Sequence, residues 1–406
     1  MAATQTKPRK HTGLKVLAIV LAVLVILICA LVTAVSVVWG NEISTAVSLT
    51  KVRDRDDAHE DGSVYTMTVK GGFYFDEYIE QGGAKSDSEL ITFITDHITK
   101  GLIDMGLQTS EIACSAFTAV TEDGDRVFGR NYDFSKTNTC IVYTDAGNGR
   151  HATVSTVDLQ FLGIDGDKDV EGLMDRVTCL AAPFAPLDGM NDAGLTCGIF
   201  MSYQGEETTA TDVDTDKPDL TSTTMLRLIL DYASTVEEAV ALVEKYDMHD
   251  SAQTSFHYMI ADATGKSAIL EWTNGTDLTD NDGSKRVLNV IYNDDDERIG
   301  EREGASDFQW ITNFILQPGY YESDDQKPGY DRYNQLYTAL SATDGVVKDM
   351  DAAMDILASV GRRDWNNDDS NSITVHSVVY NLTDKTAIWI PNEHYDDADA
   401  RFELSL

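Results

Sequence analysis

The stretch CSAFTAVTEDGDRVFGRNYDF, residues 114–134, combines one cysteine with a downstream arginine and aspartate. Asp123-Gly124 in its middle is a dipeptide typical of tight hairpin turns. A hairpin would return the chain so that Arg130 and Asp133 face Cys114 from the neighbouring strand. A thiolate attacks carbonyl carbon, an arginine favours the thiolate, and an aspartate can hold a cationic amine. The pattern predicts nucleophilic catalysis, and an inert buried cysteine near a surface ion pair is the alternative.

A catalytic cysteine needs a base, and the usual base is histidine. The chain has eight histidines, and none lies near Cys114 in a recognisable motif. A terminal α-amine is another base, with an ordinary pKa of about 7.7–8.0. For that amine to exist, the peptide bond between Ala113 and Cys114 must be cut. Four histidines could still be spatial partners of the thiol: His151, His257, His376 and His394.

The residues from Cys114 onward resemble the start of the mature choloylglycine hydrolase and penicillin V acylase enzymes, which are N-terminal-nucleophile hydrolases of linear amides. The segment ahead of Cys114 is similar to the propeptide arrangement of acid ceramidase and N-acylethanolamine acid amidase, in which autocleavage frees the nucleophile. The resemblance covers most of residues 65–406. It implies the α+β class and a four-layer αββα sandwich, which the expected alternation of hairpins and amphipathic helices also favours.

The same resemblance implies roles for individual residues. Cys114, Arg130 and Asp133 match the nucleophile, the active-site arginine and the aspartate of the family. WITNFI (310–315) implies that Asn313 helps to form the oxyanion hole, and DRYNQL (331–336) implies a second arginine, Arg332. Outside the resemblance, Asn313 could satisfy backbone groups and Arg332 could be a solvated residue at a helix start.

A turn and strand beside the site are implied by GMNDAGLTCGIF (189–200). By this alignment a backbone N–H near Met201 completes the oxyanion hole. Bile-salt hydrolases have Asn at this position and penicillin V acylases have Tyr. This departure bears on the substrate and not on the amide chemistry.

The N-terminal region carries an uninterrupted apolar run. No charged residue occurs from Val16 to Trp39, and about 20 apolar residues span a bilayer as a helix. The preceding basic residues predict a cytoplasmic N-terminus and an extracytoplasmic body. A cleavable signal peptide is the alternative, although its apolar stretch is normally shorter. The basic residues ahead of the run are Lys7, Arg9, Lys10 and Lys15.

Spacing and turn signals predict the remaining elements. Ser86 followed by Glu89 is a capping-box signal that opens an amphipathic helix at about 87–106. Further helices are expected at 221–246 and 331–342, and further hairpins at about 253–272 and 372–391. The expected organisation is a basic tail (1–15), a transmembrane anchor (16–39), a linker (40–64), a propeptide-like segment (65–113) and an amidase domain (114–406).

Composition limits the partners. Sixty-eight acidic against 31 basic residues give a formal net charge of −37, which disfavours nucleic acid. The five cysteines form no CxxC pair, so a zinc site is not expected, and a disulfide among Cys140, Cys179 and Cys197 remains open.

The sequence therefore predicts a membrane-anchored, extracytoplasmic amidase. It would hydrolyse the C–N bond of a linear N-acyl amide through a Cys114 thioester, after autocleavage at Ala113–Cys114. No metal or other cofactor is expected. An acyltransferase that uses the same acyl-enzyme and a catalytically inactive, membrane-tethered binding protein are the alternatives.

Overall fold

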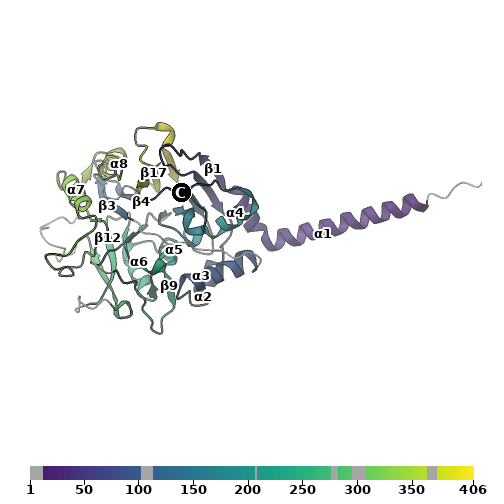
Figure 1. The fold of residues 1–406 in the computed structure, drawn as a ribbon, viewed down its shortest axis with the longest axis horizontal. Coiled ribbons are helices and arrows are strands. Elements are labelled where there is room, and N and C mark those ends of the chain that lie inside the picture. The colour runs from purple at the N-terminus through teal and green to yellow at the C-terminus, as the bar shows by residue number, and fades with distance from the viewer. Residues whose placement is uncertain (1–11, 102–112, 206–207, 276–281, 295–307, 364–372) are drawn as a thin grey trace, which may run out of the picture.

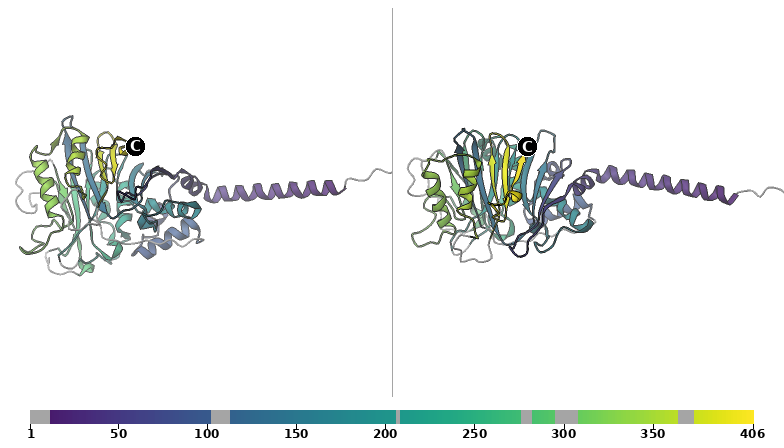
Figure 2. Two further views of the ribbon diagram at one scale, coloured as in Figure 1. Left: turned by 45° about the horizontal axis from the view of Figure 1, so that its top comes forward. Right: turned by 90° about the horizontal axis from the view of Figure 1, so that it is seen from above.

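The computed structural model describes residues 12–101, 113–205, 208–275, 282–294, 308–363 and 373–406. Two β-sheets with helices around them form the body, and one long helix projects from it (Figures 1 and 2). Side chains cross the space between the sheets. Tyr132 of one sheet donates to Asp158 of the other, and Trp389 Nε1 donates to Thr156 Oγ1. The core therefore lies between the two sheets.

The larger sheet has nine strands in the order β1-β2-β5-β6-β7-β8-β11-β12-β13. Its neighbours are antiparallel except for the parallel pair of β2 and β5. The strands are β1 Thr50–Arg53, β2 Val64–Val69, β5 Thr139–Thr144, β6 Thr153–Asp158, β7 Asp188–Asn191, β8 Thr196–Met201, β11 Phe256–Ala261, β12 Ser267–Thr273 and β13 Val287–Tyr292.

The second sheet has the order β14-β3-β4-β16-β17-β18, and β15 also pairs with β3. A separate parallel pair consists of β9 and β10. The strands are β3 Ala113–Thr121, β4 Arg126–Phe134, β9 Asp219–Thr221, β10 Asp247–His249, β14 Trp310–Ile311, β15 Val346–Val347, β16 Ile373–Asn381, β17 Thr386–Pro391 and β18 Phe402–Ser405.

Helices cover the outer faces of both sheets. On the larger sheet α5 packs against β7 and β8, and on the second sheet α8 packs against β4 and β16 while α7 packs against β3 and β14. This arrangement confirms the predicted α+β class and the four-layer αββα sandwich. The helices are α1 Thr12–Ser48, α2 Phe75–Glu80, α3 Asp87–Ile94, α4 Gly172–Thr178, α5 Ser222–Tyr232, α6 Val236–Val243, α7 Tyr330–Ser341 and α8 Met350–Ala358.

The helix predicted over 221–246 is two helices, because Thr235 caps the start of α6 by accepting from the backbone N–H of Glu238. The helix predicted over 87–106 begins as expected, with the Ser86 side chain accepting from Glu89 N. It continues as a π-helical turn, Thr95–Thr99, and residues 102–106 lie outside the described residues. The three predicted hairpins are present as β3–β4, β11–β12 and β16–β17.

The projecting helix is α1. Its Leu17–Ser48 part has a mean hydropathy of 3.3 in its most apolar window, which is not buried at all. By length and composition it can cross a membrane, and a signal sequence would pass the same test. Trp39 has non-helical angles, φ −126° and ψ 25°, at the end of the predicted membrane segment. Beyond it, Thr45 and Ala46 are buried against the body.

The linker prediction for residues 40–64 differs from the structure. This part contains the end of α1, strand β1 and the first residue of β2. The charged composition of this part resembles that of a linker because three of the four β1 residues are exposed at a sheet edge. Asp61 is 2% exposed and accepts from His394 Nε2 at 2.5 Å and from Arg363 Nη2 at 2.9 Å.

The segment ahead of Cys114 is part of the core. Strand β2 pairs with β5 over six residues, inside the nine-stranded sheet. Phe75 and Tyr78 of α2 are fully buried, with ring centroids 5.7 and 5.9 Å from that of Phe184. Gly83, at φ +77°, approaches the Asp219 carbonyl so closely that a Cβ would lie 1.7 Å from that oxygen. The segment is therefore packed against parts of the chain that follow the cysteine.

Candidate active site

The hairpin of β3 and β4 positions the predicted nucleophile. Cys114 lies opposite Tyr132, and Ala116 lies opposite Arg130. Because residues two apart in a strand share a face, the Cys114 and Arg130 side chains point the same way. They face the other sheet, where Arg130 contacts β7 and β8. The predicted approach of Arg130 to Cys114 is confirmed. Asp133 lies an odd number of residues from Arg130, so its side chain points to the opposite face of the sheet, where it bonds to Arg332 and Thr374.

Arg130 lies beside the thiol. Its Nη2 is 3.5 Å from Cys114 Sγ and donates to the Ile199 carbonyl at 2.7 Å. Its Nη1 donates to Asp188 Oδ2, and both side chains of this ion pair are fully buried. The guanidinium is thus fixed by groups of the larger sheet while one nitrogen faces the sulfur of the second sheet.

Asp188 is the centre of a buried polar network. His376 Nε2 donates to its Oδ2 at 2.8 Å, and the Tyr380 hydroxyl donates to its Oδ1 at 2.6 Å. Burial alone would raise the pKa of Asp188, but Arg130 and these two hydrogen bonds hold that pKa well below its ordinary value. The carboxylate is therefore charged at neutral pH.

A second group of residues holds the main chain of Cys114. Asn313 Oδ1 accepts from Cys114 N at 3.1 Å and from Arg332 Nη2 at 2.8 Å. Arg332 Nη1 donates to the Cys114 carbonyl at 2.9 Å and to Asp133 Oδ2 at 3.1 Å. Asp133 also accepts from Thr374 Oγ1 at 2.7 Å. The backbone on both sides of the Cys114 Cα is thus bound by side chains from distant parts of the chain.

Burial dominates the acidity of the thiol. Cys114 is fully buried, and burial raises its pKa to about 11, although Arg130 and Arg332 act in the opposite direction. Burial also raises the pKa of Asp133, against the opposing charge of Arg332. In the uncut chain the thiol is protonated at neutral pH, and thiolate formation requires a proton acceptor.

All five residues predicted for catalysis lie around Cys114, but the ion pairs among them differ from the expectation. Arg130 pairs with Asp188, and Asp133 pairs with Arg332, so Arg130 and Asp133 are not the ion pair that was considered. Arg332 is 2% exposed, which excludes the interpretation as a solvated residue.

Asn313 is oriented differently from the sequence prediction. Its oxygen must face the donors from Cys114 and Arg332, so its Nδ2 points away and donates to the Met201 carbonyl at 3.0 Å. The group of Met201 that meets Asn313 is therefore its carbonyl. In the uncut chain the amide of Asn313 satisfies backbone groups.

The four candidate histidines bond to groups other than the thiol. His257 bonds to Glu271 and to the Thr312 carbonyl, and His376 bonds to Asp188. His151 and His394 bond to aspartates, Asp192 and Asp61. None of these four histidines is bonded to Cys114 Sγ in the part of the chain that the structure describes.

The sequence interpretation did not identify four residues of the site: Asp188, Thr374, Tyr380, and His376 as a partner of Asp188. One available signal was an acidic residue, Asp188, directly before Gly189-Met190-Asn191 and after the apolar stretch that ends in Leu187. Within the described residues, no group of three or more His, Cys, Asp or Glu side chains could hold a metal ion. Cys140, Cys179 and Cys197 are buried and free.

We expect Asp188→Asn to lower the free energy of unfolding by about 3–5 kcal/mol at neutral pH, because it leaves Arg130 as an unpaired buried charge. The depressed pKa of Asp188 stabilises the fold above the unfolded-state pKa of about 3.9, and this contribution is lost as the pH falls. The difference between variant and wild type should therefore narrow below about pH 4. Urea denaturation at several pH values measures it.

Asp192→Asn is the matched control, because the Asp192 side chain is 49% exposed and its ion-pair partner is a partly exposed histidine. It should change stability by less than about 1 kcal/mol. Equal stabilities of the two variants would contradict the role assigned to Asp188.

Comparisons with known proteins agree with the motifs. A family model described as acyl-coenzyme A:6-aminopenicillanic acid acyl-transferase matches residues 120–393, which is more than half of the chain. The chain is 26% identical over 251 residues to the bile salt hydrolase/transferase of Clostridium perfringens. That alignment covers 58% of this chain and 66% of the relative, just under two thirds of the relative's length.

Two solved structures align with most of this chain. A mutant of the conjugated bile acid hydrolase from Clostridium perfringens has 15% identity and a TM-score of 0.47, over 72% of this chain and 92% of that one. Penicillin V acylase from Agrobacterium tumefaciens has 19% identity and a TM-score of 0.43, over 68% and 83%. On the match of the family model, the chain belongs to the acyl-coenzyme A:6-aminopenicillanic acid acyl-transferase family, within the choloylglycine hydrolase group of N-terminal-nucleophile enzymes that its motifs resemble.

Proposed function

We propose that the chain is a hydrolase of carbon–nitrogen bonds in linear N-acyl amides. The observation that carries this proposal is the environment of Cys114, whose thiol faces Arg130 and whose backbone nitrogen is held by Asn313. The relationship to a bile salt hydrolase/transferase supports amide chemistry. No substrate of that relative is assigned to this chain.

The first step is self-cleavage. Cys114 Sγ attacks the carbonyl carbon of Ala113, the C–N bond breaks, and the proton of the thiol passes to the departing nitrogen. The product is a thioester between Ala113 and Cys114 with a free α-amine. Water then hydrolyses the thioester, which gives the Ala113 carboxylate and the free thiol. Arg130, at 3.5 Å from the sulfur, favours the thiolate in this step.

The second step uses the new α-amine as the base. It takes the thiol proton, and the thiolate attacks the carbonyl of an N-acyl amide. The resulting ammonium protonates the leaving amine, and water hydrolyses the acyl-thioester. Asn313 Oδ1 already accepts from this nitrogen in the uncut chain, and Asp133, bonded to Arg332, supplies negative charge nearby.

The oxyanion hole is the remaining part of the proposed mechanism. The sequence-derived donors are the Asn313 side chain and a backbone N–H near Met201, and such a donor contributes on the order of 3 kcal/mol. Asn313 Nδ2 carries two N–H groups and one of them donates to the Met201 carbonyl. The second can donate to an oxyanion while Oδ1 keeps its bond to the Cys114 nitrogen.

Cys114→Ala should abolish both processing and hydrolysis, because the variant has no thiol to attack Ala113 or a substrate. Cys114→Ser should retain some processing, because the serine hydroxyl takes the position of the thiol but is a weaker nucleophile. Intact mass and N-terminal sequencing of the purified protein measure the cut.

Cys140→Ala is the matched control, because Cys140 is another fully buried strand cysteine, on the other sheet. It should be processed normally. An active preparation that contains only uncut chain would contradict the mechanism.

We also propose that α1 anchors the enzyme in a membrane, with the body outside the cytoplasm. The support is the exposed apolar surface of α1, its projection from the body and the basic residues that precede it (Figure 2). Because β2 and α2 pack in the core, the anchor-bearing segment should remain attached after the cut.

After processing, the 114–406 fragment should sediment with membranes and leave them only in denaturant. Phe75→Ala should make release occur at lower urea concentration, because truncation of a buried phenylalanine costs about 3–5 kcal/mol. Fractionation and immunodetection of the fragment give the result. Val52→Ala, at a residue 41% exposed on β1, should behave as wild type. A freely soluble, active fragment would refute retention.

A second candidate is acyl transfer to an amine in place of water. The family description and the hydrolase/transferase relative favour testing it. Products formed from N-acyl amides with and without added amine acceptors separate transfer from hydrolysis. The panel should contain bile conjugates, penicillin V, N-acylethanolamines and acyl-homoserine lactones. If an amide-like, thiol-reactive probe does not label Cys114, the tethered binding protein is favoured instead.

A further inference from the structure

An apolar groove of about 560 Å³ lies where α1 meets the body. It is separate from the residues that surround Cys114. One face of α1, one face of α4 and the π-helical turn form its walls. Its principal lining residues are Trp39, Ile43, Val47, Ile98, Leu173 and Val177.

The walls of the groove are held in place by polar contacts. Residues four apart on a helix share a face, so Ile43 and Val47 lie on one face of α1, and Trp39, where the helix is kinked, also lines the groove. Arg176 of α4 donates from Nη1 to the carbonyls of Ala46 and Leu49, both at 2.9 Å. These carbonyls lie at the C-terminal end of α1, where a helix lacks its own donors. Arg176 thus fixes α4 against α1.

The groove continues the apolar surface of the proposed anchor. Trp39 is the last residue of the predicted membrane segment and a wall of the groove. Two other residues that line the groove are exposed, Val47 to 74% and Leu173 to 73%. Exposed apolar surface of this kind marks contact with a membrane or another apolar partner. The groove therefore opens at the level where α1 would enter the bilayer.

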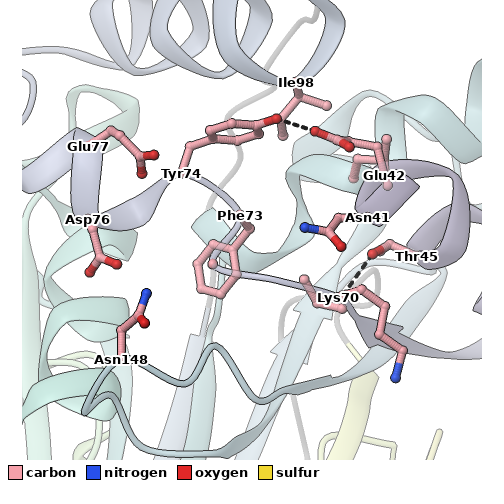
Figure 3. A pocket seen from close by; sticks show the side chains of 13 residues that line it. Asn41, Glu42, Thr45, Lys70, Phe73, Tyr74, Asp76, Glu77, Ile98 and Asn148 are labelled. Atoms are coloured by element: carbon pink, nitrogen blue, oxygen red, sulfur yellow. Dashed lines mark hydrogen bonds between the residues drawn. The ribbon is translucent and has the colours of Figure 1, made fainter. Parts of the chain in front are cut away.

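A polar pocket of about 240 Å³ adjoins the groove and shares Glu42, Ile98 and Leu180 with it. Figure 3 shows Asn41 and Glu42 of α1 on one side and Asp76 and Glu77 of α2 on the other. Three carboxylates line it, those of Glu42, Asp76 and Glu77, with one ammonium, that of Lys70. Because Asp76 also pairs with Arg150 at 3.5 Å, Glu42 and Glu77 supply the excess negative charge. The pocket therefore suits a polar group that carries a positive charge.

We propose that the groove binds an acyl chain of a membrane phospholipid whose amine-bearing head group occupies the adjoining polar pocket. The proposal rests on the proposed anchoring of α1. An apolar cavity next to a polar one matches the two parts of such a lipid. Binding would place the body at a fixed height and orientation on the membrane.

The test uses the full chain in vesicles of a phosphatidylethanolamine that carries a photoactivatable diazirine on its acyl chain. Peptide mapping after illumination should find label in 17–34, from general lipid contact, and in 39–47 and 173–180, from the groove. A phosphatidylglycerol probe of the same chain should label the groove peptides less, because its head group has no amine.

Val47→Glu and, separately, Leu173→Glu should reduce label in the groove peptides by about tenfold, because a carboxylate beside an acyl chain is poorly solvated. Both positions are exposed, so the fold should tolerate the change. Val287→Glu, at a residue 54% exposed on β13, is the matched control and should leave labelling unchanged.

The label in residues 17–34 distinguishes a failure of the lipid site from a failure of the membrane anchor. Label there without label in the groove peptides, or groove label unaffected by Val47→Glu, overturns the lipid site and leaves the anchor intact. Equal groove labelling by both probes overturns the head-group assignment. Protein–protein cross-links between groove peptides of two chains would show a second copy as the occupant and overturn the proposal. Absence of label in all three regions, with the protein in the supernatant, overturns the anchoring itself.

Discussion

The buried ion pair of Arg130 and Asp188 is the constraint on which the site depends, because it joins the two sheets beside the nucleophile. Transfer of two charges from water into a protein interior costs several kcal/mol for each ion unless further hydrogen bonds compensate. Here His376 and Tyr380 bond to the carboxylate and the Ile199 carbonyl accepts from the guanidinium. The arginine is thereby fixed with one nitrogen facing the sulfur, and neither sheet could shift without breaking this network.

The two sides of Cys114 have different environments. On one side the thiol faces the space between the sheets, where burial raises its pKa to about 11. On the other side Asn313 and Arg332 bond to its nitrogen and carbonyl. A protonated, buried thiol is a poor nucleophile toward molecules in solution, whereas the adjacent Ala113 carbonyl is within the same chain. This difference supports the proposed reaction at the chain's own peptide bond ahead of any reaction with a substrate.

Local sequence signals predicted the hairpin part of the site, whereas Asn313 and Arg332 were identified only through the family resemblance. The turn at Asp123-Gly124 determines the register that brings Arg130 near Cys114. Asp188 could not be paired with Arg130 in the same way, because it belongs to the other sheet and the contact depends on how the sheets pack.

The orientation of the Asn313 amide could not be predicted from the motif either. WITNFI identifies the residue, but the direction of its amide follows from donors on Cys114 and Arg332. In the fold as a whole, the turn signals and capping signals of the sequence located most of the helices and hairpins. Residues 40–64 were misassigned because an exposed edge strand has the charged composition of a linker.

Cleavage of one peptide bond would not divide this fold into two independent parts. The β2–β5 pairing joins backbone on opposite sides of the cut, and the rings of Phe75 and Tyr78 pack on Phe184 across it. These contacts do not involve the bond between Ala113 and Cys114, so they persist when that bond is broken. The preceding segment then acts as a tightly bound subunit, and a new N-terminus at Cys114 remains inside a body fixed to α1. In this arrangement the proposed membrane anchor and the proposed N-terminal nucleophile would lie on two chains that stay bound in one molecule.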